Sequence, residues 1–292
     1  MADYFLSIIV PHYNDWERLC RAIESIPKRD DLQIIVVDDK TEGCKERLKV
    51  LRARYPYVEF YENLTKKKGA GQARNIGLDN AYGKWVCFMD ADDYFLDTFE
   101  ETLTVLTCDI SSNVDIVFWA PTSFREGLGQ KAVRHQDYES LVKEHVDKPT
   151  INSELRLRYL FYSPCSKFIR RSLITNNSIR FDTVLYANDV MFSTKIGFYA
   201  REILAVNRTY YCISEGEGSL TTTVNKKSKR IRLKVEQKQY HYLKKHLSNM
   251  QMRELGVSVT TGIYFWLLRI GIDRDLISMC YGKVTGMFKK QE

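Results

Sequence analysis

The chain has 292 residues, of which 44% are hydrophobic and 28% are charged. These values are typical of a globular protein and exclude disordered, collagen-like and coiled-coil classes. The net charge of +7 comes from 44 basic and 37 acidic residues, and the excess is local. Between Lys226 and Arg253, ten basic residues stand against one glutamate, so this segment alone carries +9. We therefore expect an anionic neighbour near the C-terminal part, either a membrane surface or nucleic acid.

The seven cysteines are scattered along the chain. No two of them have the C-x-x-C spacing of a zinc or redox site, so we expect reduced thiols, as in a cytosolic protein. The first fourteen residues lack the basic region of a signal peptide, and their apolar run is short. Both features favour a cytoplasmic location.

The first 120 residues alternate between strand-like and helix-like patterns. Continuous apolar runs predict buried strands at Leu6–Pro11, Leu32–Val37, Val58–Tyr61, Trp85–Met89 and Val114–Trp119. Apolar residues at helical spacing predict helices within 16–26, 44–55, 70–82 and 99–106. Repeated strand–helix units need crossover connections, so we expect an α/β fold with a mostly parallel sheet and helices on both faces.

The regular alternation ends after Pro121. Residues 122–150 hold few apolar anchors, and we expect a long loop there. Further helices are predicted at 154–161 and 188–199, and short strands near 167–169 and 203–206. Two helical stretches follow from Val224, and the second contains an apolar run from Leu255 to Leu268. This run is shorter than the roughly 20 residues that a membrane span needs.

Acidic residues follow two of the predicted strands directly. Asp38 and Asp39 end the second strand, and Asp90, Asp92 and Asp93 follow the fourth. The carboxyl ends of parallel strands meet at one edge of the sheet, so these carboxylates should converge beside the end of the first strand. They would repel one another unless a cation offsets their charge, and hard divalent cations prefer such oxygen ligands. The alternative is that these aspartates are helix caps and turn residues.

A glycine-containing stretch, GAGQAR at 69–74, precedes a predicted helix. It lacks the third glycine of a dinucleotide-binding loop, and Asn63–Lys68 separates it from the preceding strand. We interpret it as a loop that leads to a helix N-terminus facing phosphate or substrate, where Arg74 and Lys66–Lys68 could supply positive charge. No P-loop motif is present.

Four fragments, SIIVPHYN, VVDD, GAGQARNIGL and FMDADD, occur in this order within the first 93 residues. Together they resemble the family 2 glycosyltransferases, which have the GT-A (Rossmann-like) fold. The fragments SKFIRR, IRF, NDV and GSLT resemble, more loosely, the bacterial members that build cell-surface polysaccharides. The resemblance implies a GT-A catalytic domain over 1–222, with a donor half in 1–120 and an acceptor half in 121–222. Residues 223–292 would be a basic and amphipathic helical extension.

The resemblance also implies roles for residues in the donor half. Pro11, Tyr13 and Asp39 match positions that hold the nucleobase, usually uracil. Asp90 and Asp92 match the DxD motif, in which the last aspartate ligates the metal on the diphosphate and the first contacts the donor ribose or sugar. The cofactor would therefore be a divalent cation, Mn²⁺ or Mg²⁺.

Residues outside these motifs have implied roles with open alternatives. Asp189 matches the general base of inverting members, or it is only a helix N-cap. Asn188 stands where the family usually has glutamate, which would put activity in doubt if that glutamate mattered. Arg74 and Lys167 are candidate contacts to the nucleotide-sugar, and a structural ion pair is the alternative for Lys167. His12 is expected to be a packing or hydrogen-bonding histidine.

The resemblance thus predicts an inverting, metal-dependent glycosyltransferase that uses a nucleotide-diphospho-sugar, usually a UDP-sugar. Its acceptor would be a saccharide or a lipid-linked molecule in polysaccharide or lipopolysaccharide synthesis. The alternatives are a catalytically impaired nucleotide-sugar-binding protein and a nucleic-acid-binding α/β protein. A sugar-phosphate nucleotidyltransferase is disfavoured, because PHYNDWERL replaces a glycine- and arginine-rich loop after the first strand. Residues 226–270 either pack on the catalytic domain or touch the inner face of the cell membrane.

Overall fold

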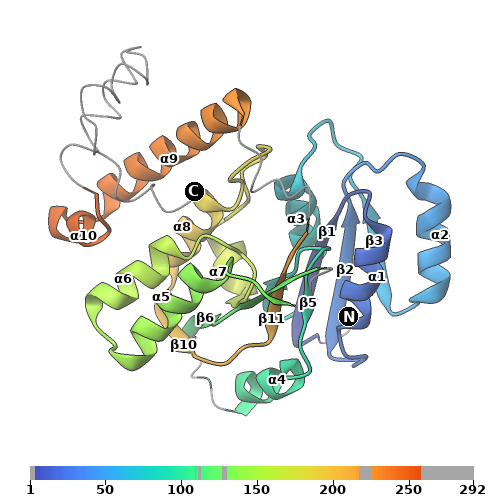
Figure 1. Cartoon of the computed structure of the whole chain (residues 1–292), viewed down its shortest axis with the longest axis horizontal. Coiled ribbons are helices and arrows are strands. Elements are labelled where there is room, and N and C mark those ends of the chain that lie inside the picture. Colours follow the sequence, from blue (N-terminus) through green and yellow to red (C-terminus); the bar gives the residue numbers. More distant parts are fainter. Residues whose placement is uncertain (1–3, 109, 111–112, 127–129, 217–224, 258–292) are drawn as a thin grey trace.

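The computed structural model describes residues 4–108, 110, 113–126, 130–216 and 225–257. Its main sheet has seven strands in the order β10-β6-β9-β4-β1-β2-β3 (Figure 1). These strands are β1 (Leu6–His12), β2 (Leu32–Asp38), β3 (Val58–Glu62), β4 (Trp85–Phe88), β6 (Val114–Trp119), β9 (Lys167–Arg170) and β10 (Glu202–Val206). All pairs are parallel except those of β9 with its two neighbours. The predicted α/β class and mostly parallel sheet are confirmed.

The strands at the centre of this sheet are apolar because both of their faces are covered. Every residue of β1, β2, β4 and β6 is buried, which explains why these segments read as continuous apolar runs. The helices of the first half are α1 (Trp16–Glu24), α2 (Cys44–Arg54), α3 (Ala70–Asp79) and α4 (Phe99–Cys108). Those of the second half are α5 (Gln136–Asp147), α6 (Ile151–Leu160), α7 (Arg171–Asn176), α8 (Val190–Tyr199), α9 (Lys226–His246) and α10 (Asn249–Glu254).

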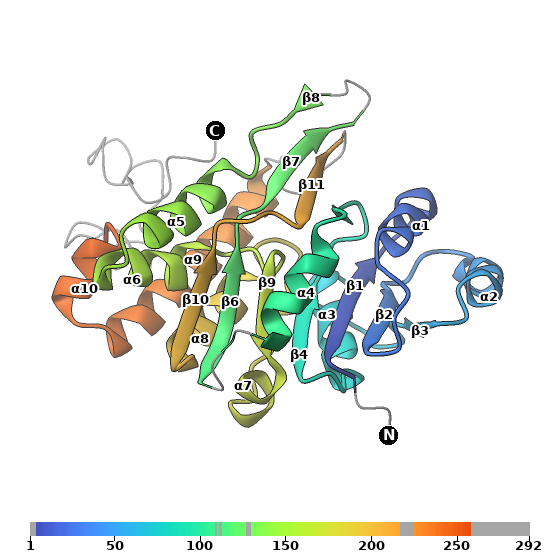
Figure 2. The ribbon, with the colours of Figure 1, turned by 90° about the horizontal axis from the view of Figure 1, so that it is seen from below.

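A second, four-stranded sheet stands beside the first. It is ordered β5-β11-β7-β8 and consists of β5 (Tyr94–Phe95), β7 (Thr122–Arg125), β8 (Gln130–Lys131) and β11 (Tyr211–Glu215). Figure 2 shows β7, β8 and β11 projecting from the body of the molecule. Strand β5 follows the acidic turn at 90–93 directly, so this small sheet fixes the position of the turn.

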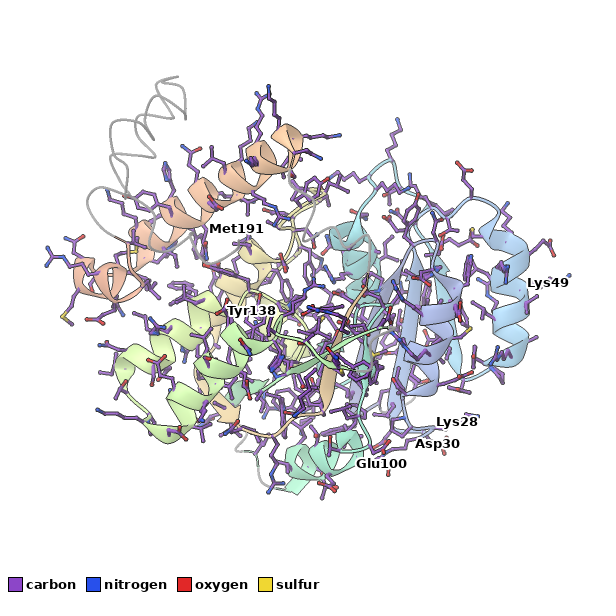
Figure 3. The ribbon with its side chains drawn as sticks, viewed as in Figure 1. Lys28, Asp30, Lys49, Glu100, Tyr138 and Met191 are labelled. Atoms are coloured by element: carbon purple, nitrogen blue, oxygen red, sulfur yellow. The ribbon has the colours of Figure 1, made fainter. Side chains whose placement is uncertain are left out.

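The expectation of a long loop over 122–150 is wrong. The segment contains β7, β8 and the whole of α5. Strand β7 pairs with β11, nearly ninety residues later in the chain, so no local pattern reveals it. Helix α5 buries Leu141 and Val142, and its Tyr138 points into the body of the molecule, where its ring stacks on that of Phe161 with centroids 4.4 Å apart (Figure 3). These three side chains are enough to pack an otherwise polar helix against the rest of the protein.

The C-terminal helices pack against the second half of the chain. Leu243 of α9, Met252 of α10 and the following Leu255 form a small apolar cluster with Leu155 and Tyr159 of α6. The packing alternative for residues 226–257 is therefore confirmed for one face of α9. The remainder of the apolar run to Leu268 lies outside the described residues, and so does the predicted domain boundary at 222.

Two further sequence expectations can be compared with the structure. The five cysteines whose side chains are described carry free thiols, as their spacing predicts. Within the described ranges, no helix combines the length and apolar character that crossing a bilayer requires.

Candidate functional site

The carboxyl ends of β1, β2 and β4 meet at one edge of the main sheet. His12 ends β1 and pairs in register with Asp38, and the Asp39 amide donates a hydrogen bond of 2.7 Å to the His12 carbonyl oxygen. On the other side of β1, the Met89 amide bonds the Ile9 carbonyl oxygen, and the chain then turns through 90–93. The two acidic clusters therefore emerge at the same edge, as predicted.

Asp38 has a structural role in this edge. Its buried carboxylate accepts hydrogen bonds from His12 Nδ1 at 3.0 Å and from the Thr41 amide at 2.9 Å. Burial alone would raise the pKa of Asp38, but these hydrogen bonds outweigh it and hold the pKa below its usual value. The His12 ring also packs on Trp16 with centroids 4.2 Å apart. His12 is thus the packing and hydrogen-bonding residue that the sequence predicts.

Asp39 organises the loop in front of α3. One carboxylate oxygen accepts from Asn63 Nδ2 and the other from the Gly69 amide, both at 2.6 Å. A carboxylate has about four acceptor positions, so two remain for a further donor. Pro11 lies buried in β1, whereas Tyr13, at the end of β1, is 49% exposed with Lys68 Nζ 3.7 Å from its ring centroid. The three candidate nucleobase contacts therefore share one edge of the sheet.

The turn after β4 brings three carboxylates together. Oxygen atoms of Asp90, Asp92 and Asp93 lie within 4.8 Å of one another. Burial, and then the neighbouring charge of Asp90, raises the pKa of Asp92 to about 6. Within the described part of the chain, no side chain donates a hydrogen bond to the Asp92 carboxylate. Clustered hard oxygen ligands with mutual repulsion fit a divalent cation.

Asp93 is buried beneath this turn and fixes its shape. Its carboxylate accepts from the Tyr211 hydroxyl at 2.6 Å and from the Ser214 amide at 2.8 Å. Burial and the charges of Asp92 and Asp90 raise its pKa well above the usual value. Both partners belong to β11, so the second sheet holds the turn from below.

Arg21 of α1 holds the same turn from the side. Its guanidinium donates to the main-chain carbonyl of Asp92, to Ser214 Oγ at 3.0 Å and to the Glu126 carboxylate at 2.6 Å. Sequence reasoning missed Arg21, Tyr211 and Ser214. Their contacts span 71 to 193 residues along the chain, and no local pattern marks such contacts.

Arg74 joins the acidic turn to the start of α8. Its side chain is almost fully buried and donates to Asp90 at 2.5 Å and to Asn188 Oδ1 at 2.8 Å. Burial disfavours the charged form of Arg74, but the negative charges of Asp90 and Asp189 favour it more strongly. The pKa of Arg74 therefore lies above its ordinary value. The predicted positive charge of Arg74 thus lies at this edge, paired with the carboxylate of Asp90.

The glycine stretch before Arg74 allows a close approach of two segments. A Cβ on Gly71 would collide with the Asp182 carbonyl oxygen and lie 3.0 Å from the Cβ of Asn188. Glycine is needed there so that α3 can contact the segment that leads into α8. The residue pattern at 69–74 therefore has a packing cause in addition to any role toward a ligand.

Asp189 occupies the N-cap position of α8, but its side chain makes no capping hydrogen bond. It is half-buried, and burial raises the pKa of its carboxyl, while the charges of Arg74 and Lys167 offset part of the rise. Capping therefore does not explain the presence of an acidic side chain here. A carboxylate with a raised pKa is better suited to accept a proton near neutral pH.

Lys167, the first residue of β9, is buried in the core. Its side chain is 1% exposed, and its Nζ donates to the Phe161 carbonyl oxygen at 2.6 Å and lies 4.5 Å from the Phe161 ring centroid. Burial lowers its pKa to about 7, while Asp189 offsets part of that effect. Its ammonium group therefore forms no ion pair with any described residue, and its hydrogen-bonding partner is a carbonyl group of the core.

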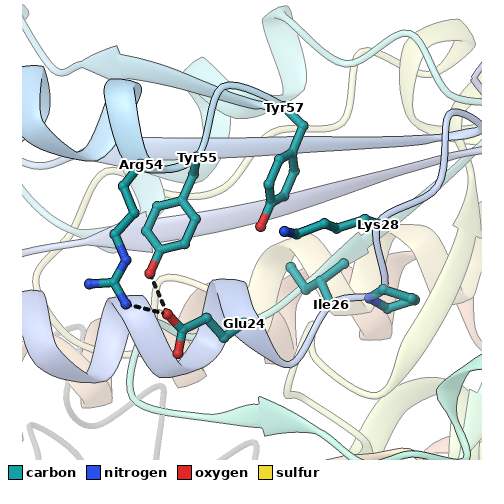
Figure 4. Close-up of a pocket in the computed structure, with 7 residues that line it drawn as sticks. Glu24, Ile26, Lys28, Arg54, Tyr55 and Tyr57 are labelled. Carbon is teal, nitrogen blue, oxygen red and sulfur yellow. Dashed lines mark hydrogen bonds and ion pairs between the residues drawn. The ribbon is translucent and has the colours of Figure 1, made fainter.

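The cavity between α1 and α2 lies away from this site. Its volume is about 510 Å³, and it is lined by Glu24, Ile26, Pro27, Lys28, Arg54, Tyr55 and Tyr57 (Figure 4). Most of these residues precede β2 and β3, so the cavity is at the opposite edge of the sheet. Glu24 accepts from both Arg54 and Tyr55 at 2.6 Å, so the carboxylate in this cavity already has two donors.

The mostly parallel sheet brings Asp39, after β2, and the acidic turn, after β4, to the edge at which α/β proteins of this class bind their ligands. Comparison with known families agrees with this. Residues 7–176 match the model of glycosyl transferase family 2, and the chain belongs to this family.

Two curated relatives are similar over about 70% of the chain. A glycosyltransferase, YibD, of Escherichia coli is 27% identical over 217 residues, which cover 70% of this chain and 60% of YibD. The poly(ribitol-phosphate) beta-N-acetylglucosaminyltransferase TarS of Staphylococcus aureus is 27% identical over 219 residues, covering 73% of this chain and 36% of TarS. The chain therefore spans between one third and two thirds of the length of these relatives.

Solved structures are similar in fold. A Staphylococcus aureus TarS structure with UDP-GlcNAc aligns with a TM-score of 0.67 at 19% identity, over 93% of this chain and 77% of that one. A mannosyltransferase of Pyrobaculum calidifontis, solved with GDP-Man and Mn²⁺, aligns with a TM-score of 0.58 at 14% identity, over 99% and 82%. These likenesses establish the GT-A fold.

Proposed function

We propose that this chain is an inverting, metal-dependent glycosyltransferase. It moves a sugar from a nucleotide-diphospho-sugar to an acceptor hydroxyl in the synthesis of a cell-surface polysaccharide or lipopolysaccharide. One observation carries the proposal: Arg74 hydrogen-bonds both Asp90 of the acidic turn and Asn188, the neighbour of Asp189. A donor bound at the turn and a proton acceptor at the start of α8 would then lie on either side of the buried guanidinium group of Arg74.

The donor in this proposal is a UDP-sugar. Its nucleobase lies against Pro11 and Tyr13, with Asp39 accepting from the ring N–H. The hydrogen bonds from Asn63 and Gly69 support this role, since they hold the Asp39 carboxylate in one orientation before any base arrives. UDP-GlcNAc is the first donor to test, because TarS is named as an N-acetylglucosaminyltransferase and was solved with it.

The acidic turn would hold Mn²⁺ or Mg²⁺ through Asp92, and Asp90 would contact the ribose or sugar. The cation supplies Lewis-acid stabilisation of the charge that develops on the departing diphosphate. Arg21 and Asp93 keep the turn in place, so its carboxylates are already positioned when the donor binds. The neighbouring mannosyltransferase structure contains Mn²⁺, which supports the choice of ion.

Asp189 acts as the general base in this proposal. Its carboxylate takes the proton of the acceptor hydroxyl while that oxygen forms a bond to the anomeric carbon. The bond from the anomeric carbon to the diphosphate breaks at the same time, and the nucleoside diphosphate leaves with the electron pair. This single displacement inverts the anomeric configuration. Lys167 is not part of the step, because its ammonium group bonds a core carbonyl.

The hydrogen bonding of Asn188 favours an active transferase over the alternative, a protein that binds a nucleotide-sugar but does not transfer the sugar. Its Oδ1 accepts from Arg74, so the position remains hydrogen-bonded although the charge of a glutamate is missing. We propose that Asn188 orients Arg74, and that Asp189 alone handles the proton. A binding protein would bind UDP-GlcNAc with Mn²⁺ and release no UDP in the presence of any acceptor.

We also propose that the enzyme works at the cytoplasmic face of the cell membrane, where residues 226–270 contact the surface and a lipid-linked or polymeric acceptor is found. The local charge of +9 between Lys226 and Arg253 supports this location.

The experiment is a screen of UDP-sugars for release of UDP in the presence of polyol-phosphate and saccharide acceptors, with and without Mn²⁺. Transfer should require both the cation and an acceptor, and the product should have the opposite anomeric configuration to the donor. Thermal stabilisation by UDP with Mn²⁺ measures donor binding separately. A retained configuration would contradict the single displacement, and stabilisation without Mn²⁺ would contradict the metal site.

A further inference from the structure

Helix α9 exposes one kind of side chain along its length of about 31 Å. Ten of its residues are exposed, and all are lysine, arginine or histidine: Lys226, Lys227, Lys229, Arg230, Lys234, Lys238, His241, Lys244, Lys245 and His246. We call these ten residues the basic face of α9. Long side chains extend from the outer side of this helix, away from the body of the molecule (Figure 3).

The opposite face of α9 is fixed to the protein. Ser228, Val235, Gln239 and Leu243 are buried, and Gln239 Nε2 donates to Thr194 Oγ1 of α8 at 3.0 Å. The capping box at Asn225 and Ser228 closes the first turn of the helix. The basic face is therefore held in one orientation and presents its charges as a fixed array.

Among the described residues, few acidic side chains offset the charge of the basic face. Of its ten residues, Lys238 alone forms an ion pair with a described residue, Asp182, at 2.7 Å. The single acidic residue of α9, Glu236, is half-buried and does not belong to this face. Cations arranged in this way repel one another, so an anionic surface beside them would be stabilising.

Lipid headgroups fit this face better than single-stranded nucleic acid does. Non-specific binding of single strands combines basic side chains with aromatic side chains that stack on bases, and the basic face has no exposed Tyr, Phe or Trp. No apolar side chain is exposed there either, so the helix has nothing to insert between acyl chains. A straight row of cations on a fixed helix is complementary to a flat anionic surface.

The basic face also has a fixed relation to the proposed site. The ion pair from Lys238 to Asp182, and the Arg232 guanidinium 5.5 Å from the Tyr186 ring centroid, attach α9 to the segment that leads into Asp189. We propose that the basic face of α9 adsorbs electrostatically to an anionic lipid surface. This deepens the proposed location, and it brings the acceptor side of the site next to the membrane.

The test is co-sedimentation of the full chain with vesicles of phosphatidylcholine, with and without phosphatidylglycerol. A triple variant, Lys227→Gln with Arg230→Gln and Lys234→Gln, removes three charges from the face. Each charge near an anionic surface is worth roughly a fivefold change in binding, so the variant should bind anionic vesicles about 100-fold more weakly. The matched control is Lys45→Gln with Arg47→Gln and Lys49→Gln on α2, at the other end of the molecule (Figure 3), and it should bind like the wild type.

Four outcomes decide the proposal. Binding that needs phosphatidylglycerol, falls with salt and is lost only in the α9 variant supports it. Equal binding to neutral vesicles overturns it, and so does equal loss in both variants. A single-stranded RNA that competes with the vesicles at lower concentration shows that the partner is nucleic acid. Release of UDP from UDP-GlcNAc with a soluble acceptor should not differ between the two variants, so failure here is distinguishable from failure of the proposed transferase activity.

Discussion

Replacing Asp189 by asparagine separates catalysis from binding and folding. The amide keeps the shape of the carboxylate but cannot take a proton. In the structure the Asp189 side chain makes no capping hydrogen bond, and Arg74 bonds Asp90 and Asn188 rather than Asp189, so the change removes neither of these hydrogen bonds. Neutralising a carboxylate whose pKa is raised by burial also removes a desolvation cost. We therefore expect the melting temperature and the affinity for UDP-GlcNAc to stay near those of the wild type.

The rate of transfer should respond strongly to the same change. Loss of a general base costs about 10²–10⁴-fold in rate, which corresponds to roughly 3–5 kcal/mol of transition-state stabilisation. Steady-state release of UDP measures the rate, and calorimetric titration with UDP-GlcNAc and Mn²⁺ measures binding. Asp182→Asn is the matched control, since it removes a carboxylate of the same segment whose ion pair with Lys238 is partly solvent-exposed and worth about 1 kcal/mol. A wild-type rate in Asp189→Asn would refute the reasoning, because the base would then be another group.

Three further changes test other parts of the site. Asp92→Asn should abolish Mn²⁺-dependent UDP binding in calorimetry while the circular dichroism spectrum is unchanged, and equal affinities with and without Mn²⁺ would contradict a metal role. Asp39→Asn should weaken UMP and UDP binding by the same factor, because the lost acceptor faces the base; a loss seen with UDP alone would indicate a phosphate or metal contact. Lys167→Met tests the buried ammonium, whose pKa of about 7 lies below its ordinary value of 10.5, so the unfolded chain binds more protons between these values. The free energy of unfolding of the wild type should therefore rise with pH in this range by up to about 1.4 kcal/mol per unit, and urea denaturation of the variant should lack that contribution.

The donor half of the fold could be predicted because its causes are local. Strands β1, β2 and β4 are buried on both faces, so their sequences are continuous apolar runs. In the helices between them, the apolar residues recur at helical spacing. Once these strands are parallel, their carboxyl ends must share an edge. The convergence of Asp39 with Asp90 and Asp92 follows from that topology without any knowledge of side-chain contacts.

In the second half, α6, α8, β9 and β10 match predicted elements, but β7, β8 and α5 were missed, and the pairing of the strands depends on contacts that are distant in the chain. Strand β7 exists through its pairing with β11, and β9 runs antiparallel between β4 and β6. Lys167 illustrates the same limit for a single residue, since a lysine in a strand gives no indication that its ammonium group will bond the Phe161 carbonyl in the core. Arg21 lies in an ordinary amphipathic helix, and only the tertiary structure brings it to the Asp92 carbonyl.

The proposed site depends on both halves through a few buried bonds. The carboxylates of the acidic turn repel one another, and that repulsion would open the turn if nothing held it. Tyr211 and Ser214 of the second sheet donate hydrogen bonds to the buried Asp93. Arg74 of α3 neutralises Asp90 and also donates a hydrogen bond to Asn188. Because Asn188 is neutral, the charge of Arg74 is not shared with a second carboxylate at that position. The charge of Arg74 therefore acts on two carboxylates. It pairs with Asp90 and it partly offsets the rise that burial causes in the pKa of Asp189, so it couples the donor side of the site electrostatically to the proton-accepting side.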